Sequence, residues 1–165
     1  MNDEEYFKEG EQRNVYISRH NRYTPAFLHR YNFFEIVFVY HGTCTQNIGT
    51  TRKHFSEGDV IFIAPGIYHT IEVFQDQAVV FNILIQQKTF HQMFLPLASG
   101  NNLQSQFFKE GLYNQHRLEY LVYHTQDSWK SFVLKMYYEH LNHDAFSDQI
   151  LIGMMTCLLY TSPSP

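Results

Sequence analysis

The segment from residue 29 to residue 69 constrains the fold most, because short strand-like runs alternate in it with glycines. Aromatic and β-branched side chains dominate residues 33–40 and again residues 60–64, which is the composition of paired strands rather than helices. Glycines separate such runs at intervals of roughly eight residues; they are Gly42, Gly49, Gly58 and Gly66. Turns spaced this closely are typical of an all-β barrel or sandwich.

Further strand-like segments flank this stretch, and helical spacing replaces them toward the C-terminus. Alternating or continuous apolar runs predict strands at 15–23, 43–48, 51–55, 70–74, 79–85 and 120–124. Apolar residues then recur at helical spacing in two short segments, near 90–97 and 103–108. Two longer helices follow, one from Trp129 to His140 and one that begins at Ser147. The predicted fold is therefore mainly β, with a C-terminal pair of α-helices.

Composition divides the chain into four parts. Residues 1–14 are charged and polar, and we expect them to form a flexible N-terminal arm. Residues 15–126 contain the predicted strands, and residues 127–156 contain the helical pair. The last segment, CLLYTSPSP at 157–165, resembles a translated sequencing adapter. We expect this segment to be an artefact and the native chain to continue beyond Thr156.

Bulk properties argue against several classes of protein. Of the 165 residues, 44% are hydrophobic, which indicates a packed domain rather than a disordered chain. The net charge of −4 argues against binding of a nucleic-acid backbone by these residues. No run is apolar enough for a membrane span or a secretion signal, so we expect a cytoplasmic protein that does not contact a membrane. Cys44 and Cys157 match no metal or redox spacing.

Polar side chains lie at regular positions before and within the apolar run that ends at residue 40. Residues two apart on a strand face the same side, so one face carries five side chains of interest. They are His29, Tyr31, Phe33, Glu35 and Val37. His69 follows a Pro-Gly turn and can approach this face from a neighbouring strand.

Three interpretations fit these side chains. Imidazole and carboxylate groups bind borderline or hard metals, so His29, Glu35 and His69 are the candidate ligands of a metal with an open position. The polar members can instead form a buried hydrogen-bonded network. In the third interpretation the group lines a pocket for a small polar ligand among aromatic walls. We favour the third, without metal or other cofactor. Its ligand-binding residues are His29, Tyr31, Phe33, Glu35, Val37 and His69.

The spacing of these residues resembles the first motif of the cupin family. His29, Tyr31, Glu35 and Gly42 keep the intervals of that motif, except that Tyr31 stands where the motif has its second His. Catalytic cupins present three His and one Glu to a metal. Tyrosine is a poor ligand for a divalent metal while it stays protonated, so the resemblance implies the fold more strongly than the catalysis.

The second cupin motif is matched in part. Gly58, Gly66 and His69 correspond to it, whereas Pro65 is displaced by one position and Val73 stands where the motif has Asn. Together the two motifs imply a cupin or jelly-roll barrel, that is, a double-stranded β-helix.

A longer stretch resembles the N-terminal sensor domain of AraC/XylS-family transcription regulators. The specific matches are the turn Glu57-Gly58-Asp59 and the run from Pro65 to His69. The resemblance covers about residues 15–156 and is strongest in the first half. It implies that residues 127–156 are dimerisation and linker helices. It also implies that two helix-turn-helix units follow Thr156 in the native protein.

From this resemblance we predict the ligand-sensing and dimerisation domain of an AraC-like regulator. Its partner is a small-molecule effector, such as a sugar, bound in the barrel, and DNA is contacted only through the missing C-terminal region. We expect a homodimer formed through the apolar faces of Trp129 and Ile150, and no enzyme activity. The alternative is a stand-alone metal-dependent cupin enzyme of the isomerase or dioxygenase type.

Overall fold

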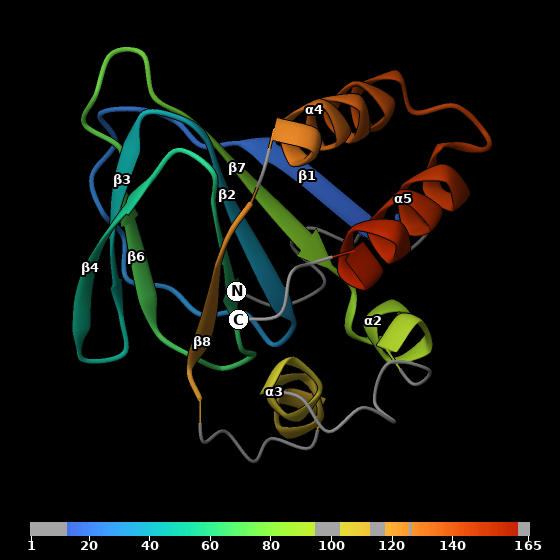
Figure 1. The fold of residues 1–165 in the computed structure, drawn as a ribbon, viewed down its shortest axis with the longest axis horizontal. Coiled ribbons are helices and arrows are strands. Elements are labelled where there is room, and N and C mark those ends of the chain that lie inside the picture. The colour runs from blue at the N-terminus through green and yellow to red at the C-terminus, as the bar shows by residue number, and fades with distance from the viewer. Residues whose placement is uncertain (1–12, 95–102, 113–117, 126, 162–165) are drawn as a thin grey trace.

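The computed structural model describes residues 13–94, 103–112, 118–125 and 127–161, which form eight strands and four helices. Five strands make the larger sheet (Figure 1), in the order β1 (Val15–Arg19), β7 (Val79–Ile85), β2 (Phe34–His41), β5 (Asp59–Ile63) and β8 (Tyr120–His124). Three strands make the smaller sheet, in the order β4 (Thr51–Ser56), β3 (Thr43–Ile48) and β6 (His69–Glu72). Every pair of neighbouring strands is antiparallel.

The two facing sheets form the jelly-roll barrel that the motifs predict. Strands far apart in the sequence are neighbours in the larger sheet, since β7 lies between β1 and β2, and β5 lies between β2 and β8. The predicted hairpin is β3–β4, which is joined at Gly49 and Thr50. All four turn glycines have the positive φ that favours glycine. The prediction of a mainly β cupin fold is therefore confirmed.

Strand β2 is a continuous apolar run because both of its faces are covered. Val37 and Val39 belong to the core between the two sheets. Phe34 and Phe38 point to the opposite side, where their rings contact Phe90 and Trp129 of the helical layer. This alternation places the side chain of every second β2 residue inside the barrel.

Four helices cover the outer face and one end of the larger sheet. They are α2 (Gln87–Phe94), α3 (Leu103–Leu112), α4 (Asp127–Asn142) and α5 (Ser147–Thr161). Helices α4 and α5 pack against each other and against β1, as Figure 1 shows on the right. The predicted C-terminal pair is confirmed.

Two predicted segments lie partly outside the described residues. Of the predicted arm at 1–14, only residues 13 and 14 are described. Helix α5 runs through the first part of the segment at 157–165, and Leu158 and Leu159 are buried in the helical layer. The adapter origin of this segment stays a prediction.

The apolar face of α4 corrects one prediction. Trp129 is only 5% exposed and packs with Val133 and Met136 in the core under the larger sheet. The face that contains Trp129 therefore stabilises this chain and is not available to a partner. An amphipathic pattern shows that a helix face is buried but not what buries it.

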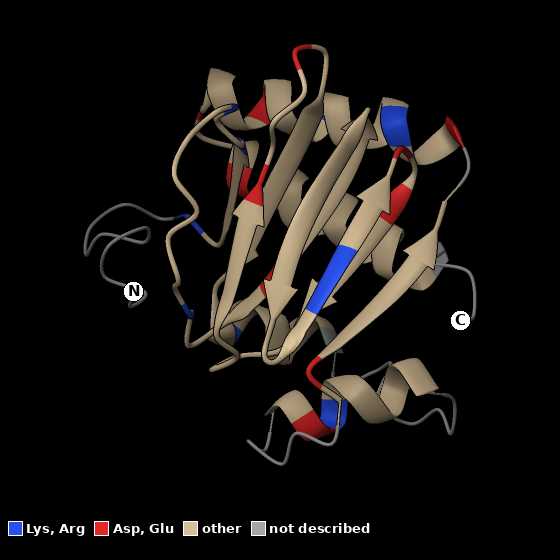
Figure 2. Cartoon of the chain, turned by 90° about the vertical axis from the view of Figure 1, so that its left-hand side faces the viewer, with Lys and Arg blue, Asp and Glu red and all other residues tan. Residues whose placement is uncertain are grey.

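Charged groups do not form one dominant surface in the described part of the chain. Figure 2 shows Lys and Arg in blue and Asp and Glu in red, scattered over strands, turns and helices. Among the described helices, none combines the length and the hydrophobicity that crossing a bilayer requires.

Candidate functional site

A buried ion pair joins the two sheets inside the barrel. Glu35 lies on β2 and His69 begins β6, and their Oε2 and Nε2 atoms are 2.6 Å apart. Both side chains are 2% exposed. At this distance the carboxylate and the imidazolium form an ion pair. Burial lowers the pKa of His69, but the Glu35 carboxylate outweighs burial and leaves this pKa raised.

His29 is fixed next to this pair by the backbone. His29 and His69 exchange two backbone hydrogen bonds, of 3.0 and 2.9 Å, and their rings lie 4.2 Å apart. His29 Nδ1 bonds the carbonyl oxygen of Phe27 at 2.8 Å. Because a carbonyl only accepts, this nitrogen carries the proton and Nε2 keeps its lone pair. Burial, together with the nearby His69, lowers the pKa of His29.

The predicted aromatic residues lie beside these histidines. The Tyr31 ring lies 5.2 Å from the His29 ring and stacks on Phe33 at 4.8 Å. Both aromatic residues are buried. Val37 belongs to the core between the sheets and pairs with Asn82 of β7. The structure thus brings five of the six predicted ligand-binding residues together and places Val37 farther along the same face of β2.

A pocket of about 470 Å³ opens next to this group, between β1, β7 and the connection that leads from β1 to β2. Of the six predicted residues, only His29 and Tyr31 line it. The Glu35–His69 pair lies behind the His29 ring and is shielded from solvent. The remaining wall includes residues that sequence reasoning missed. They are Tyr16, Ser18, Arg19, His20, Asn21, Thr24, Pro25, Phe27, Ile71 and Asn82.

His20 and Asn82 are two missed residues whose polar side chains meet in the pocket wall. Asn82 Nδ2 lies 3.4 Å from His20 Nδ1. Burial lowers the pKa of His20, while the Glu35 charge raises it to a smaller extent. One signal was available in the sequence, since Asn82 is the single polar residue of the apolar strand VVFNILI. Nothing local in the sequence indicated that His20 would reach the same place.

His29, Glu35 and His69 also offer a possible metal site. One donor atom from each lies within 4.8 Å of the others. Each imidazole has its Nδ1 bonded to a backbone carbonyl, that of Phe27 or that of Ile67. Such bonds direct Nε2 toward a metal in many metalloproteins. The donor set therefore fits a metal with three protein ligands, although a metal must displace the proton that Glu35 stabilises on His69.

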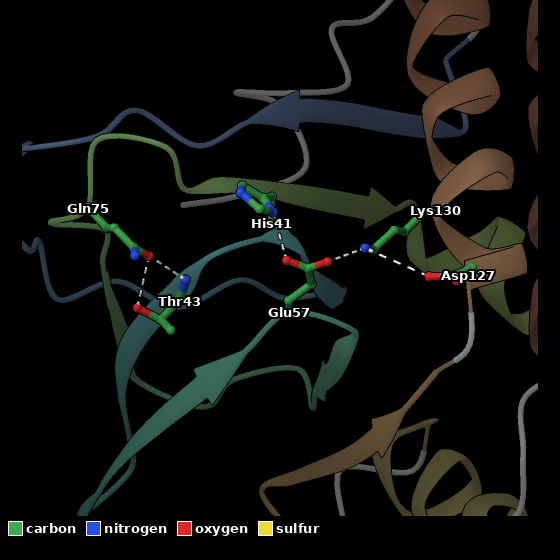
Figure 3. A network of polar contacts seen from close by, with 6 residues as sticks. All are labelled: His41, Thr43, Glu57, Gln75, Asp127 and Lys130. Atoms are coloured by element: carbon green, nitrogen blue, oxygen red, sulfur yellow. Dashed lines mark hydrogen bonds and ion pairs between the residues drawn. The ribbon is translucent and has the colours of Figure 1, made fainter.

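A second polar network connects the barrel to α4 (Figure 3). Glu57, in the turn between β4 and β5, accepts a bond from Lys130 of α4 and lies 2.7 Å from His41 Nδ1. The bond from Lys130 lowers the pKa of Glu57, and that from His41 lowers it further. Thr125, just before α4, donates its backbone N–H and its hydroxyl to the carbonyl oxygen of Gly58, both at 2.8 Å. The β4–β5 turn is thus tied to the start of α4.

Solved structures with the same fold include several of ToxT from Vibrio cholerae. Apo ToxT K231A from strain SCE256 aligns with a TM-score of 0.62 and 11% identity, over 88% of this chain and 54% of that chain. ToxT from strain O395 bound to (E)-4-(8-methylnaphthalen-1-yl)but-3-enoic acid aligns with a TM-score of 0.57 and 9% identity, over 87% and 54%. Fatty-acid-bound ToxT from strain SCE256 gives 0.54 and 8%, over 87% and 50%. The chain spans about half the length of these proteins.

The sequence itself identifies the family. No curated protein matches it. Residues 14–109, which include β1 to β7 and every residue of the candidate site, match the family described as the AraC-like ligand binding domain. This match covers more than half of the chain. The protein therefore belongs to the family of AraC-like ligand-binding domains.

Proposed function

We propose that this domain is the ligand-sensing part of an AraC-like transcription regulator and that its effector binds in the pocket lined by β1, β7 and the connection from β1 to β2. The observation that carries the proposal is the pocket of about 470 Å³ at the barrel mouth, within the range of small-molecule sites. Its wall combines apolar groups such as Phe27 and Ile71 with His29 and Tyr31. Such a wall suits a small molecule that is partly apolar and partly polar.

The predicted residues have different roles in this proposal. His29 and Tyr31 contact the effector. The Glu35–His69 pair lies behind them, and two backbone hydrogen bonds between His29 and His69 fix the His29 backbone beside it. Phe33 supports Tyr31 by stacking. Val37 packs in the barrel core next to the strand that carries Asn82.

The class of effector is proposed as a small metabolite, with a sugar as the initial candidate. The two ligand-bound ToxT structures contain a fatty acid and an aryl butenoic acid, so acids with an apolar chain are the other class to test. A pocket for a sugar must offer many hydrogen bonds, whereas a pocket for an apolar acid needs a mainly apolar wall and polar groups at one end.

The signal is proposed to pass from the barrel to α4. The Glu57 and Gly58 turn is tied to Lys130 and Thr125 at the start of α4, so a shift of the turn changes the position of this helix. Dimerisation is proposed through four exposed side chains of α4, α5 and the turn between these helices. They are Tyr138, Leu141, Phe146 and Ile150. DNA binding is proposed for a region beyond this chain, and the cytoplasm is the proposed location.

The proposal is tested by titrating the protein with a panel of monosaccharides and unsaturated fatty acids while heat release and thermal unfolding are measured. At least one compound is expected to bind and to raise the melting temperature. His29→Ala is expected to weaken this binding about tenfold or more. The matched control is His54→Ala, because His54 is exposed on β4 and lies outside the pocket. Equal affinities of the two variants would contradict the proposed site.

The second candidate function is that of a metal-dependent cupin enzyme. The observation in its favour is the close group of His29, Glu35 and His69. This candidate requires that purified protein retain stoichiometric metal by mass spectrometry and that His69→Ala release it. If the domain is instead a regulator, we expect the purified protein to contain less than one metal per chain and His69→Ala to leave this metal content unchanged.

A further inference from the structure

We infer that His20 and Asn82 are the specificity-determining pair of the pocket and that they select an uncharged effector group, a hydroxyl or a carboxamide, over a carboxylate. The inference rests on the proposed function, because it concerns the same pocket. Beyond the proposed function, we assign the recognition of the ligand to two residues and name the chemical class of the group that they bind.

The backbone holds this pair in a defined position. His20 directly follows β1, and its N–H donates to the carbonyl oxygen of Val80 at 2.8 Å. Asn82 lies in the middle of β7, where it pairs with Ser18 of β1. Both side chains line the pocket. Because neighbouring strands fix both residues, little conformational entropy is lost when a ligand binds to them.

Each member of the pair has one polar atom without a partner. Asn82 donates from Nδ2 to His20 Nδ1, at 3.4 Å. Among the described residues, His20 Nε2 and Asn82 Oδ1 have no hydrogen-bond partner, although both atoms are shielded from solvent. Shielded polar groups are usually paired, so these two atoms indicate a partner that enters the pocket.

The two unpaired atoms have opposite roles. Since His20 Nδ1 accepts, the neutral ring carries its proton on Nε2, which is then a donor, while Asn82 Oδ1 is an acceptor. If the Asn82 amide is rotated by 180°, its oxygen accepts from His20 Nδ1. His20 Nε2 is then the acceptor and the Asn82 nitrogen the donor, so one donor and one acceptor again remain. A hydroxyl or a carboxamide satisfies both, because each of these groups donates and accepts. An ionised carboxylate only accepts and leaves one of the two atoms unpaired.

The charges around the pair agree with an uncharged ligand group. Burial lowers the pKa of His20, so the ring is neutral near pH 7 and offers no positive charge to an anion. The buried charges of His69 and Glu35 are paired with each other. Arg19 also lines the pocket, but it is exposed at the rim. A carboxylate bound by Arg19 is therefore the competing outcome, and the test separates it from recognition by the pair.

The experiment uses three probes with the same apolar chain, namely octanamide, 1-octanol and octanoate. Their affinities are measured by calorimetry with the unmodified protein and with Asn82→Val and His20→Phe. We expect octanamide or 1-octanol to bind at least about tenfold more tightly than octanoate, and each variant to reduce this preference to within about twofold. The matched control His54→Phe is expected to keep the full preference. Either substitution alone removes the pair. If one of the two variants fails to fold, the other still tests the inference.

Three results overturn the inference. The first is octanoate binding as tightly as octanamide and 1-octanol to the unmodified protein, with Arg19→Gln abolishing that binding. The second is a preference that Asn82→Val and His20→Phe both leave unchanged.

The third result arises if none of the three probes binds but a sugar or fatty acid of the wider panel does. The variants are then measured with that compound, and unchanged affinity overturns the inference while the proposed pocket stands. If His29→Ala also leaves that affinity unchanged, or if no compound binds at all, the proposed function is overturned together with the inference.

Discussion

His69 Nε2 lies 2.6 Å from Glu35 Oε2, and both side chains are withdrawn from solvent. This contact connects β6 of the smaller sheet to β2 of the larger sheet and lies directly behind His29 of the pocket. Its loss leaves one charge buried without its partner, which is costly in a protein interior. The pair is therefore important for both the barrel and the site.

Glu35→Gln is expected to lower the free energy of unfolding on the order of 3 kcal/mol at pH 6, because it leaves the His69 imidazolium unpaired. The pKa of His69 is raised above 6.5 in the folded protein. The stabilisation is thus complete below pH 6.5 and is lost as the pH rises through the folded pKa. The difference between the two proteins, measured by urea denaturation, is expected to shrink at pH 9.

The control for this variant is Arg52→Gln, since Arg52 forms an ion pair with Glu72 on the surface and its side chain is 56% exposed. Exposed pairs contribute less than about 1 kcal/mol. Similar losses for Glu35→Gln and Arg52→Gln would contradict the importance of the buried pair.

His140 is expected to make the protein sensitive to acid. Its pKa is lowered to about 4, mainly by burial and to a smaller extent by the nearby charges of Arg13 and His143. The unfolded chain binds the proton near pH 6.5, so stability is lost as the pH falls from 6.5 toward 4, by roughly 3 kcal/mol. His140→Phe is expected to flatten this part of the stability profile. If the His140→Phe variant lost as much stability between pH 6.5 and 4 as the unmodified protein, other groups would be responsible for the loss.

The exposed side chains of α4 and the following turn are expected to form the dimer contact. Leu141→Asp and Phe146→Asp place charges where apolar contact is proposed and are expected to convert dimers to monomers in sedimentation experiments without unfolding. Phe74→Asp is the control, because Phe74 is equally exposed but lies in the β6–β7 connection. A monomeric unmodified protein at high concentration would reject this contact.

A Trp129→Ala variant separates the dimer face from the core. Trp129 packs under the larger sheet, and truncation of a buried aromatic residue costs about 3–5 kcal/mol. We expect this variant to lose stability without a specific effect on dimerisation. If Trp129→Ala dissociated the dimer without changing the free energy of unfolding, Trp129 would belong to the dimer interface instead.

Lys130→Met is expected to loosen the start of α4 without affecting the barrel, because it removes the bond from Lys130 to Glu57. Hydrogen exchange is expected to accelerate at residues 127–133 and to stay unchanged in β2. High salt is expected to reduce the difference from the unmodified protein, since this contact is partly exposed to solvent. Lys135→Met, on the same helix, is the matched control.

Much of the fold follows from local sequence patterns. The apolar run of β2 and the four turn glycines predict an all-β barrel or sandwich, because strand periodicity and turn conformation depend mainly on neighbouring residues. The resemblance to the cupin motifs narrows this prediction to a jelly roll. The intervals between His29, Glu35 and His69 also predict that these residues meet, which the structure confirms. Their role in ligand binding stays a prediction.

The tertiary structure alone decided where the pocket lies and what α4 packs against. His20 meets Asn82 because β1 pairs with β7 in a register that sets Ser18 opposite Asn82. Pairing between strands so distant in the sequence leaves no trace in local periodicity. Likewise, the apolar face of α4 is encoded locally, but its burial against the barrel rather than a second subunit depends on the position of the whole sheet. Sequence by itself determined the elements and the turns, and long-range packing determined the site.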